Sequence, residues 1–283
     1  MLFCVYFKNF VCRVLDIFFP KCCLFCNDEL SVSDIGCSGD CVGCDFLCKS
    51  CRNEIMPIDQ KNCCKRCGYP FYCSMLLKDN VHFKTNFLNK TNITCPSCLS
   101  GKCYFNIARS CFQYKTKLRR LLMNFKFFFQ TEAIDLIGSS MLSCYLTMQK
   151  ADIICCIPVT KTKLFLKGYN HASLMASSFY KHLEKTTRNN DVVLLLDLLL
   201  KTSESKQSKQ LLYKERMSKQ YNFVVNNKYL STKWRQFFEK KTILIVDDIM
   251  TTGATLNFGS LVLKQAFPSV KVNCLTLART MLY

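Results

Sequence analysis

The 283-residue sequence lacks an uninterrupted apolar run of the roughly 20 residues that a membrane-spanning helix needs. Asp16, Lys126 and Asp197 interrupt the candidate stretches, so we expect no membrane span. Residues 1–13 carry Lys8 and Arg13 inside their apolar stretch and show no small-residue cleavage site, unlike a secretory signal peptide. We therefore expect a cytoplasmic protein whose thiols stay reduced.

Two phosphate-binding signatures are also absent. Neither the Walker-type GxxxxGK[ST] pattern nor the dinucleotide GxGxxG pattern occurs, which argues against an ATPase and a dehydrogenase. Acidic residues are few, because 20 Asp+Glu stand against 39 Lys+Arg, for a formal charge of +19. Intrinsic disorder is excluded by the 49% apolar content, which is enough for a sizeable core.

Cysteine is abundant and unevenly placed. Residues 1–104 hold 17 of the 22 cysteines and a formal charge of +3, whereas residues 105–283 hold 5 cysteines and +16. This contrast predicts a Cys-rich domain over 1–104 and a second, basic domain over 105–283.

Four Cys-x-x-Cys pairs lie in the first domain. A two-residue gap lets both sulfurs of a tight turn face one ion, and two such turns complete a tetrahedral site. Taken in sequence order, the pairs predict two zinc-ribbon-like sites, the first of Cys23, Cys26, Cys48 and Cys51 and the second of Cys64, Cys67, Cys95 and Cys98. An iron–sulfur cluster would use the same thiolates, but the ribbon spacing favours about two structural Zn²⁺ ions.

The remaining cysteines have no clear partners. Cys37, Cys41 and Cys44 offer alternative ligands for the first site, whereas Cys22, Cys63, Cys73 and Cys103 border the two sites. Those in apolar surroundings are predicted to be small core residues: Cys4, Cys12, Cys111, Cys144, Cys155, Cys156 and Cys274. Each Zn²⁺ with four thiolates carries a charge of −2, so two sites would take residues 1–104 from +3 to −1. A nonspecific grip on a phosphate backbone is therefore expected on residues 105–283.

The second domain shows strand and helix patterns in alternation. An amphipathic helix is predicted around Lys117–Phe129, where basic residues separate apolar ones. Strands are predicted over 153–159, 192–196, 243–246 and 272–277, and helices over 171–183 and 254–266. The alternation predicts an α/β fold with a mostly parallel sheet flanked by helices.

The most specific motif lies in residues 243–255. An apolar strand reaches Asp247 and Asp248, then a turn containing Thr251, Thr252 and Gly253 enters a helix. Ligands of parallel sheets bind at the carboxyl ends of strands. Free amides at the helix start and the threonine hydroxyls would hold a phosphate monoester. The two carboxylates would accept hydrogen bonds from sugar hydroxyls or hold a metal through water.

This segment resembles the phosphoribosyltransferase signature for phosphoribosyl pyrophosphate (PRPP), in which four apolar residues and two acids lead to Thr-Thr-Gly-x-Thr. Every position is matched. The resemblance implies a type I phosphoribosyltransferase-like fold, Mg²⁺-dependent binding of PRPP, and Asp247 and Asp248 as catalytic residues. The implied PRPP-binding residues are Val246, Asp247, Asp248, Ile249, Met250, Thr251, Thr252, Gly253, Ala254 and Thr255.

Further stretches narrow the resemblance to the ComF family, which joins a double zinc ribbon to a phosphoribosyltransferase domain and is linked to DNA uptake in natural competence. They are the four cysteine pairs, Leu15–Pro20, Phe105–Arg109, Lys117–Leu121, Ile157–Val159 and Lys167–Asn170. By this resemblance Thr160 and Lys161 would hold pyrophosphate, although surface lysines are the ordinary alternative. The implied partners are PRPP or a related sugar phosphate, and single-stranded DNA or a DNA-uptake helicase.

Two departures and two functions stay open. His171 stands where the family has Gln, and we expect a helix-start residue there rather than a catalytic base. Residues 201–213 are predicted to form a loop that closes over the site, or a plain surface connection. One function is a phosphoribosyltransferase with an unknown acceptor. The alternative is a non-catalytic protein that keeps the PRPP pocket and binds nucleic acid or a nucleotide with its basic surface.

Overall fold

The computed structural model describes residues 22–26, 28–30, 47–71, 93–101, 103–128, 131–187, 191–202 and 222–281. The chain divides into two compact units. The smaller unit is drawn from Met1–Met56 and Lys115–Leu136, and the larger unit from Pro57–Tyr114 and Ile137–Tyr283. The boundary after residue 104 that the composition predicts is not tested by this division and stays a prediction.

The smaller unit contains helix α2 (Lys49–Glu54) and helix α5 (Thr116–Phe128). Leu118, Leu121 and Leu122 of α5 are buried, while Arg119 and Arg120 beside them are exposed. This alternation is the amphipathic helix that the sequence predicts around residues 117–129. Helix α6 (Thr131–Tyr145) follows it along the chain.

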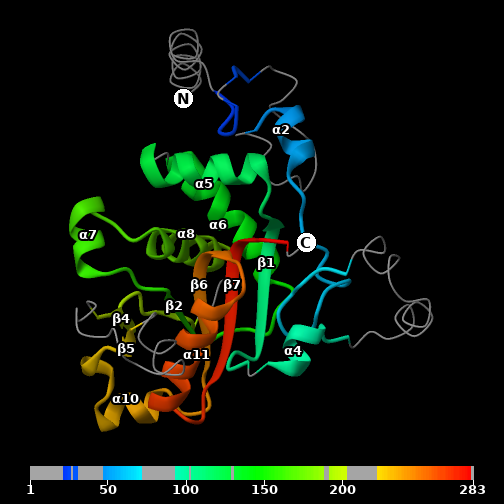
Figure 1. Ribbon diagram of the computed structural model, residues 1–283. Coiled ribbons are helices and arrows are strands. Elements are labelled where there is room, and N and C mark those ends of the chain that lie inside the picture. The colour runs from blue at the N-terminus through cyan, green and yellow to red at the C-terminus, as the bar shows by residue number, and fades with distance from the viewer. Residues whose placement is uncertain are drawn as a thin grey trace, which may run out of the picture. The chain divides into compact units, whose positions relative to one another are not determined.

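A five-stranded parallel sheet forms the centre of the larger unit (Figure 1). Its strands, in the order in which they pair, are β1 (Ile107–Gln113), β7 (Lys271–Arg279), β6 (Thr242–Met250), β2 (Ile153–Cys156) and β3 (Val193–Leu194). The two longest strands pair from Thr242 opposite Lys271 to Met250 opposite Arg279. The predicted α/β fold with a mostly parallel sheet is confirmed, and β1 is a strand that the sequence did not predict.

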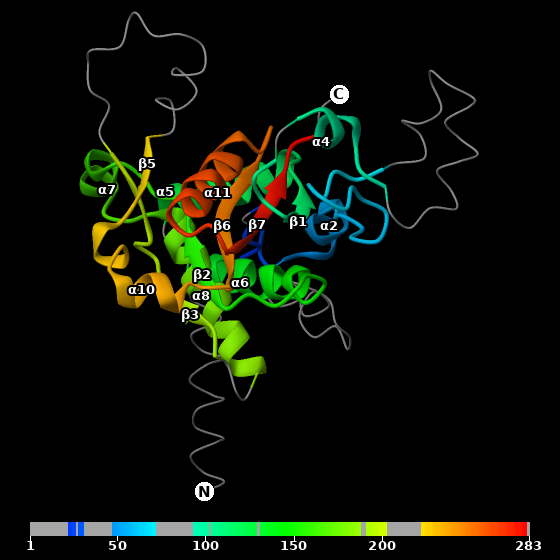
Figure 2. The ribbon, with the colours of Figure 1, turned by 90° about the horizontal axis from the view of Figure 1, so that it is seen from below.

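Helices cover both faces of this sheet. Helix α8 (His171–Thr186) leads from β2 to β3, and α11 (Ala254–Ala266) leads from β6 to β7, towards the other edge. Because parallel crossovers are right-handed, helices that run to opposite edges lie on opposite faces (Figure 2). The bounds of α11 are those predicted, and α8 runs slightly past its predicted end.

A smaller antiparallel pair, β4 (Leu199–Lys201) and β5 (Phe223–Val225), precedes the 3-10 turn η2 (Asn227–Tyr229) and helix α10 (Thr232–Phe237). Trp234 of α10 packs its ring edge-on against Tyr229, with 4.9 Å between centroids. These elements were not predicted. Most of the predicted closing loop over 201–213 lies outside the described residues.

No helix within the described ranges combines the length and apolarity needed to cross a membrane.

Candidate functional site

The eight predicted ligand cysteines gather in two groups, paired as the sequence predicts. In each group the four Sγ atoms lie within 4.8 Å of one another. Cys26 and Cys48 bring their sulfurs to 3.7 Å, and Cys67 and Cys95 to 3.6 Å. A tetrahedron with metal–sulfur bonds of about 2.3 Å has edges of about 3.8 Å. Each group can therefore hold one zinc ion, which would act as a structural crosslink.

Backbone amides surround the sulfurs of both groups. In the first, the amide of Cys51 donates to Cys48 Sγ at 3.4 Å, where Cys48 caps α2. The amide of Cys48 donates to Cys23 Sγ at 3.3 Å. In the second, the amides of Cys67 and Cys95 donate to Cys64 Sγ at 3.5 and 3.3 Å. Such amides favour thiolates, which are the metal-binding form of cysteine.

The acidity of one thiol in each group follows from these contacts. The Cys67 thiol donates to Cys64, and together with the amides it lowers the Cys64 pKa to about 4. Burial raises the pKa of Cys23, but amides of Cys26, Cys48 and Phe25 outweigh it and lower the value to about 7. Each group thus contains one thiol that loses its proton readily and can bind a metal as a thiolate.

The second group is part of the core of the larger unit. Its four cysteines are buried and belong to the same cluster as Phe105, Ala108 and residues of β6 and α11. The Cys64–Cys67 turn lies against β1, since the amide of Ala108 donates to the carbonyl of Arg66 at 2.7 Å. Gly68 ends that turn at φ +67°, and a Cβ there would meet the Ala108 carbonyl at 2.8 Å. Glycine is therefore needed for this approach.

Of the other cysteines, Cys111, Cys144, Cys155, Cys156 and Cys274 are buried, as predicted for small core residues. Cys103 donates to Cys98 Sγ at 4.0 Å, at the margin of the second group. Cys63 is buried and Cys22 exposed. The remaining predictions, for Cys4, Cys12, Cys37, Cys41, Cys44 and Cys73, concern residues outside the described ranges.

The predicted phosphate loop joins β6 to α11. The strand continues beyond Val246 to Met250, because Asp247, Ile249 and Met250 still pair with β7. Asp247 and Asp248 are therefore strand residues, and each accepts the following amide through Oδ1, at 2.9 and 2.7 Å. The exposed Thr251 and Thr252 form the turn.

Gly253 completes the turn at φ +80° and is the N-cap of the 13-residue helix α11. The first amides of a helix have no carbonyl partner within it, so this end favours an anion. Thr252 Oγ1 lies 3.4 Å from the Ala254 amide, next to Thr255 in the first turn. The residues that the signature assigns to phosphate thus stand at a helix start after a parallel strand.

Thr160 and Lys161 follow the neighbouring strand β2. Cys156 pairs with Val246, and the Ile157 amide donates to the Val246 carbonyl at 3.0 Å, so both turns leave the same edge of the sheet. Thr160 caps α7 (Lys161–Lys167) by accepting the Lys163 amide, and Lys161 is exposed. The structure brings the two predicted turns to one edge.

Asn170 and His171 anchor the next helix. Asn170 Nδ2 donates to the Ile157 carbonyl at 2.9 Å, and Asn170 Oδ1 accepts the Ala172 amide. His171 is the buried first residue of α8, with its ring edge-on to Tyr169 at 4.9 Å. This is the helix-start position that the sequence predicts for the histidine.

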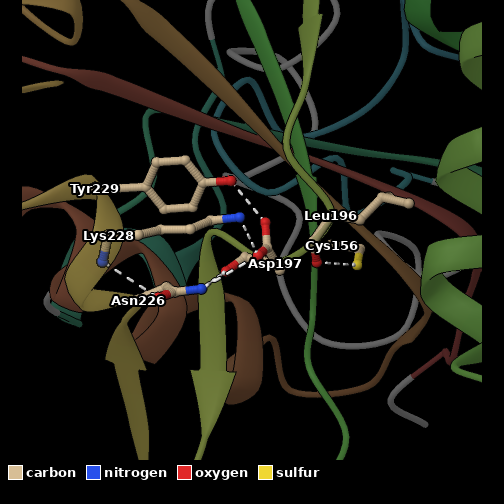
Figure 3. A network of polar contacts seen from close by, with 6 residues as sticks. All are labelled: Cys156, Leu196, Asp197, Asn226, Lys228 and Tyr229. Atoms are coloured by element: carbon tan, nitrogen blue, oxygen red, sulfur yellow. Dashed lines mark hydrogen bonds and ion pairs between the residues drawn. The ribbon is translucent and has the colours of Figure 1, made fainter.

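Sequence reasoning missed Asp197, which follows β3 at the same edge. Tyr229 donates to Asp197 Oδ1 at 2.6 Å, Lys228 Nζ lies 2.5 Å from Oδ2, and Asn226 Nδ2 donates to both Oδ2 and the backbone carbonyl at 3.2 Å (Figure 3). Burial raises the pKa of Asp197, but Lys228 and Tyr229 outweigh it and lower the pKa. An acid directly after a predicted strand, as at Asp247, was the signal available.

Cys156 lies within the electrostatic reach of both acids. Burial raises its pKa to about 12, and the charges of Asp247 and Asp197 add to the rise. Its thiol donates to the Leu196 carbonyl at 3.4 Å. Asp247 and Asp197 therefore both lie near Cys156, at the edge where a sugar phosphate and a cation are predicted.

No family model matches the chain. It is similar to the protein described as Competence protein ComFC of Bacillus subtilis (strain 168), with 24% identity over 236 residues, which cover 83% of this chain and 84% of that protein. The resemblance to the ComF family that the motifs predict is confirmed by this match and by the two cysteine groups.

Proposed function

We propose that this relative of the ComF family is a phosphoribosyltransferase that binds PRPP with Mg²⁺ at the carboxyl edge of its sheet. The observation that carries the proposal is the complete Val246–Thr255 signature standing between β6 and α11. Ligands of open parallel sheets bind at such strand ends. The similarity to Competence protein ComFC supports the family context.

Each part of the edge has a role in this proposal. The amides at the start of α11 and the hydroxyls of Thr251, Thr252 and Thr255 would bind the 5′-phosphate. Asp247 and Asp248 would hold the ribose hydroxyls, or Mg²⁺ through water. Thr160 and Lys161 would bind the pyrophosphate.

The reaction would break the bond between the anomeric carbon and a pyrophosphate oxygen. The electron pair leaves with pyrophosphate, and a nucleophile of the acceptor bonds to the carbon. Positive charge grows on the ribose as negative charge grows on the leaving group. Carboxylates beside the ribose and cations beside the pyrophosphate would stabilise both.

The test is calorimetry with PRPP and Mg²⁺ on wild type and on the double variant Asp247→Asn/Asp248→Asn. Asparagine keeps the Oδ1 acceptors for the following amides but removes both charges. Since hydrogen bonds to charged groups contribute about 1.5–3 kcal/mol each, we expect the affinity for PRPP to fall by at least about 100-fold.

Asp152→Asn is the matched control. Asp152 precedes β2 at the opposite, amino edge, where it accepts the Thr242 amide at 2.7 Å and pairs with Lys241 at 3.0 Å. PRPP affinity should stay near that of wild type. Equal affinity of wild type and the double variant would contradict the proposal.

Helix α7 favours a second candidate function, binding of single-stranded nucleic acid. Phe165 is 89% and Leu166 75% exposed, and they stand among Lys161, Lys163 and Lys167. An exposed aromatic ring among cations suits a base stacked above a phosphate backbone. With the basic balance of residues 105–283, this helix is where we place contact with DNA or a nucleotide.

Fluorescence anisotropy with a labelled single-stranded oligonucleotide tests this candidate. We expect affinity to fall steeply with salt, and Lys163→Gln/Lys167→Gln to reduce the slope by roughly 0.7 per lost phosphate contact. Arg119→Gln/Arg120→Gln changes an equally basic, exposed pair on α5 and is the control. Absence of binding at low salt would eliminate the candidate.

The cellular role is proposed from the relative. Competence protein ComFC is named for competence, and we propose that this chain also serves DNA uptake from the cytoplasmic side, with single-stranded DNA or an uptake helicase as partner. Co-purification of a helicase that is lost on Phe165→Ala would support the partner, and retention of the pair would count against α7 as the contact.

A further inference from the structure

Arg279 is a buried cation that touches the second cysteine group. It is the final residue of β7 and only 4% exposed. Its Nη1 donates to the Cys67 carbonyl at 2.6 Å, and its Nη2 to Cys67 Sγ at 3.6 Å. The guanidinium also lies over the Tyr69 ring, 5.1 Å from the centroid. Nothing in the PRPP signature uses this residue.

A buried guanidinium needs a counter-charge, because removal from water strongly disfavours an isolated ion. Within the described ranges no carboxylate forms an ion pair with Arg279. Four thiolates around Zn²⁺ carry a net charge of −2, directly beside the guanidinium. Outer-shell hydrogen bonds to metal ligands typically hold the ligands in place and tune metal affinity. With zinc bound, the second centre would therefore supply the counter-charge of Arg279.

The same guanidinium is also connected to the phosphate loop, through the side chain of Met250. Met250 pairs with Arg279 across β6 and β7, and its Sδ accepts a hydrogen bond from Nη1 at 3.0 Å. The Met250 side chain in turn lies under Gly253, since a Cβ on that glycine would be 2.6 Å from Met250 Cε. Cys67, Arg279, Met250 and Gly253 thus form a continuous line of contacts.

We propose that Arg279 is a positioning residue that couples the second metal centre to the phosphate loop. It neutralises the thiolates and holds Met250 beneath Gly253, so that an occupied centre favours the loop geometry that binds PRPP. The role of Arg279 at the metal centre is argued from its contacts with Cys67 alone. Its effect on PRPP binding rests on the proposed function. Because coupling between two sites is reciprocal in binding free energy, bound PRPP must also raise the affinity of this centre for zinc. We expect this gain in affinity to appear as slower zinc release.

Zinc release into a chromogenic chelator tests the coupling on the full-length wild-type protein. We expect two phases, one for each centre, and saturating PRPP with Mg²⁺ should slow one phase several-fold while leaving the other unchanged. This measurement needs no variant, so it does not depend on how well a variant folds. Two phases that are both unaffected by bound PRPP would overturn the coupling.

Arg279→Met removes the charge and the donors while keeping an unbranched apolar side chain. We expect zinc release in the PRPP-sensitive phase to rise by at least about tenfold, in the range usual for outer-shell changes, and PRPP affinity to fall. Arg279→Lys keeps the charge but not the planar pair of donors. It should restore most of the zinc retention and little of the PRPP affinity, a split that a simple loss of stability would not produce.

Lys117→Met is the matched control at the first centre, where Lys117 Nζ donates to Cys51 Sγ at 3.6 Å. It should speed the other release phase and leave PRPP affinity unchanged. Release from Arg279→Met at the wild-type rate would overturn the proposal. If wild type bound no PRPP, the proposed function would fail, while the zinc-release rates would still decide the role of Arg279 at the metal centre.

Discussion

The two cysteine centres are built from the same pairs but stand in different surroundings. The first has two partly exposed ligands, Cys26 and Cys48, and its nearby cation Lys117 is shared with Glu54 at 3.3 Å. The second has four buried ligands, and its cation Arg279 is buried with it. Zinc in the first centre would be a local crosslink, whereas the cysteines of the second centre are part of the core that carries the sheet.

The comparison shows that metal-ligand spacing specifies a site but not its structural role. Two turns and a tetrahedral ion are enough to form either centre. What differs is the set of contacts beyond the ligands, in which Arg279, Arg109 and Arg66 all donate to backbone or sulfur atoms at or near the second centre. Loss of the same ion should therefore have unequal consequences.

Removing one ligand from each centre is the strongest way to break the comparison. Cys67→Ser should release about one zinc per chain and lower the melting temperature of the larger unit by about 10 °C, because an incomplete buried centre leaves charges uncompensated. Cys26→Ser should release a similar amount of zinc with little change in that transition. The chain has one tryptophan, Trp234, in α10 of the larger unit, so its fluorescence reports that unit.

Elemental analysis of both variants gives the zinc count, and thermal unfolding followed at Trp234 gives the stability. Equal melting temperatures for the two variants would show that the second centre is no more integral than the first. A folded wild-type protein without zinc would remove the basis for both.

Two glycines test how closely the second centre approaches β1. Gly68→Ala should cost about 2–4 kcal/mol, because a Cβ adds a close backbone contact to the strain of a positive φ. Gly168 also has a positive φ, +76°, but has nothing within 4 Å of its Cβ position. Gly168→Ala should therefore cost only about 1 kcal/mol. Urea unfolding monitored at Trp234 compares them, and equal costs would mean that the approach to β1 is not close.

Ionic strength should affect the contributions of Lys117 and Arg279 to zinc retention differently. At 0.1 M salt the screening length is about 10 Å and at 1 M about 3 Å, and screening is weak for buried charges. The effect of Lys117→Met on zinc release should therefore shrink between low salt and 1 M, whereas that of Arg279→Met should persist. Chelator kinetics at both ionic strengths measure this, and identical salt dependence would place both cations in similar surroundings.

The Asp197 network provides the smallest expected effect, in a part of the larger unit distant in sequence from the two groups of ligand cysteines. A lowered pKa means that Asp197 stabilises the fold above its unfolded pKa of about 3.9, and that this contribution is lost as pH falls through the folded pKa. Since its side chain is 48% exposed, solvent screening limits the contribution to under about 1 kcal/mol.

Asp197→Asn should accordingly lower the free energy of unfolding slightly at pH 7, with the difference from wild type vanishing at acid pH. Unfolding curves at several pH values, followed at Trp234, measure the difference. A difference that grows on acidification would reverse the sign of the assigned pKa shift.

Local patterns predicted the cysteine groups, the parallel sheet and α11, because each depends on spacing within a short segment. Strand β1 escaped prediction because polar residues lie inside it. Ser110 is fully buried and its hydroxyl lies 2.6 Å from that of Thr276, while Gln60 donates to the Ser110 carbonyl at 2.9 Å. These polar groups are satisfied only by distant partners, which no pattern of apolar residues reveals.

The same reason explains what was missed at the site. Asp197 interrupts an apolar run in the sequence, and its partners Asn226, Lys228 and Tyr229 come from a separate segment. The role of Arg279 could not be predicted from the sequence, because its contact with Cys67 joins residues 212 positions apart. The sequence indicates which residues are acidic, basic or metal-binding. Which of them contact one another depends on the completed sheet.

The pairing of β1 with β7 also determines when the sheet can be completed as the protein folds during synthesis. Among the described strands β1 pairs only with β7, and facing residues such as Ser110 and Thr276 are 166 positions apart. On the ribosome, the four cysteines of the second group emerge long before β7, so zinc would be able to reach them before the sheet is complete. Such non-local closure slows folding. An early metal crosslink would keep the edge of the nascent sheet in a defined conformation until its partner strand and Arg279 arrive.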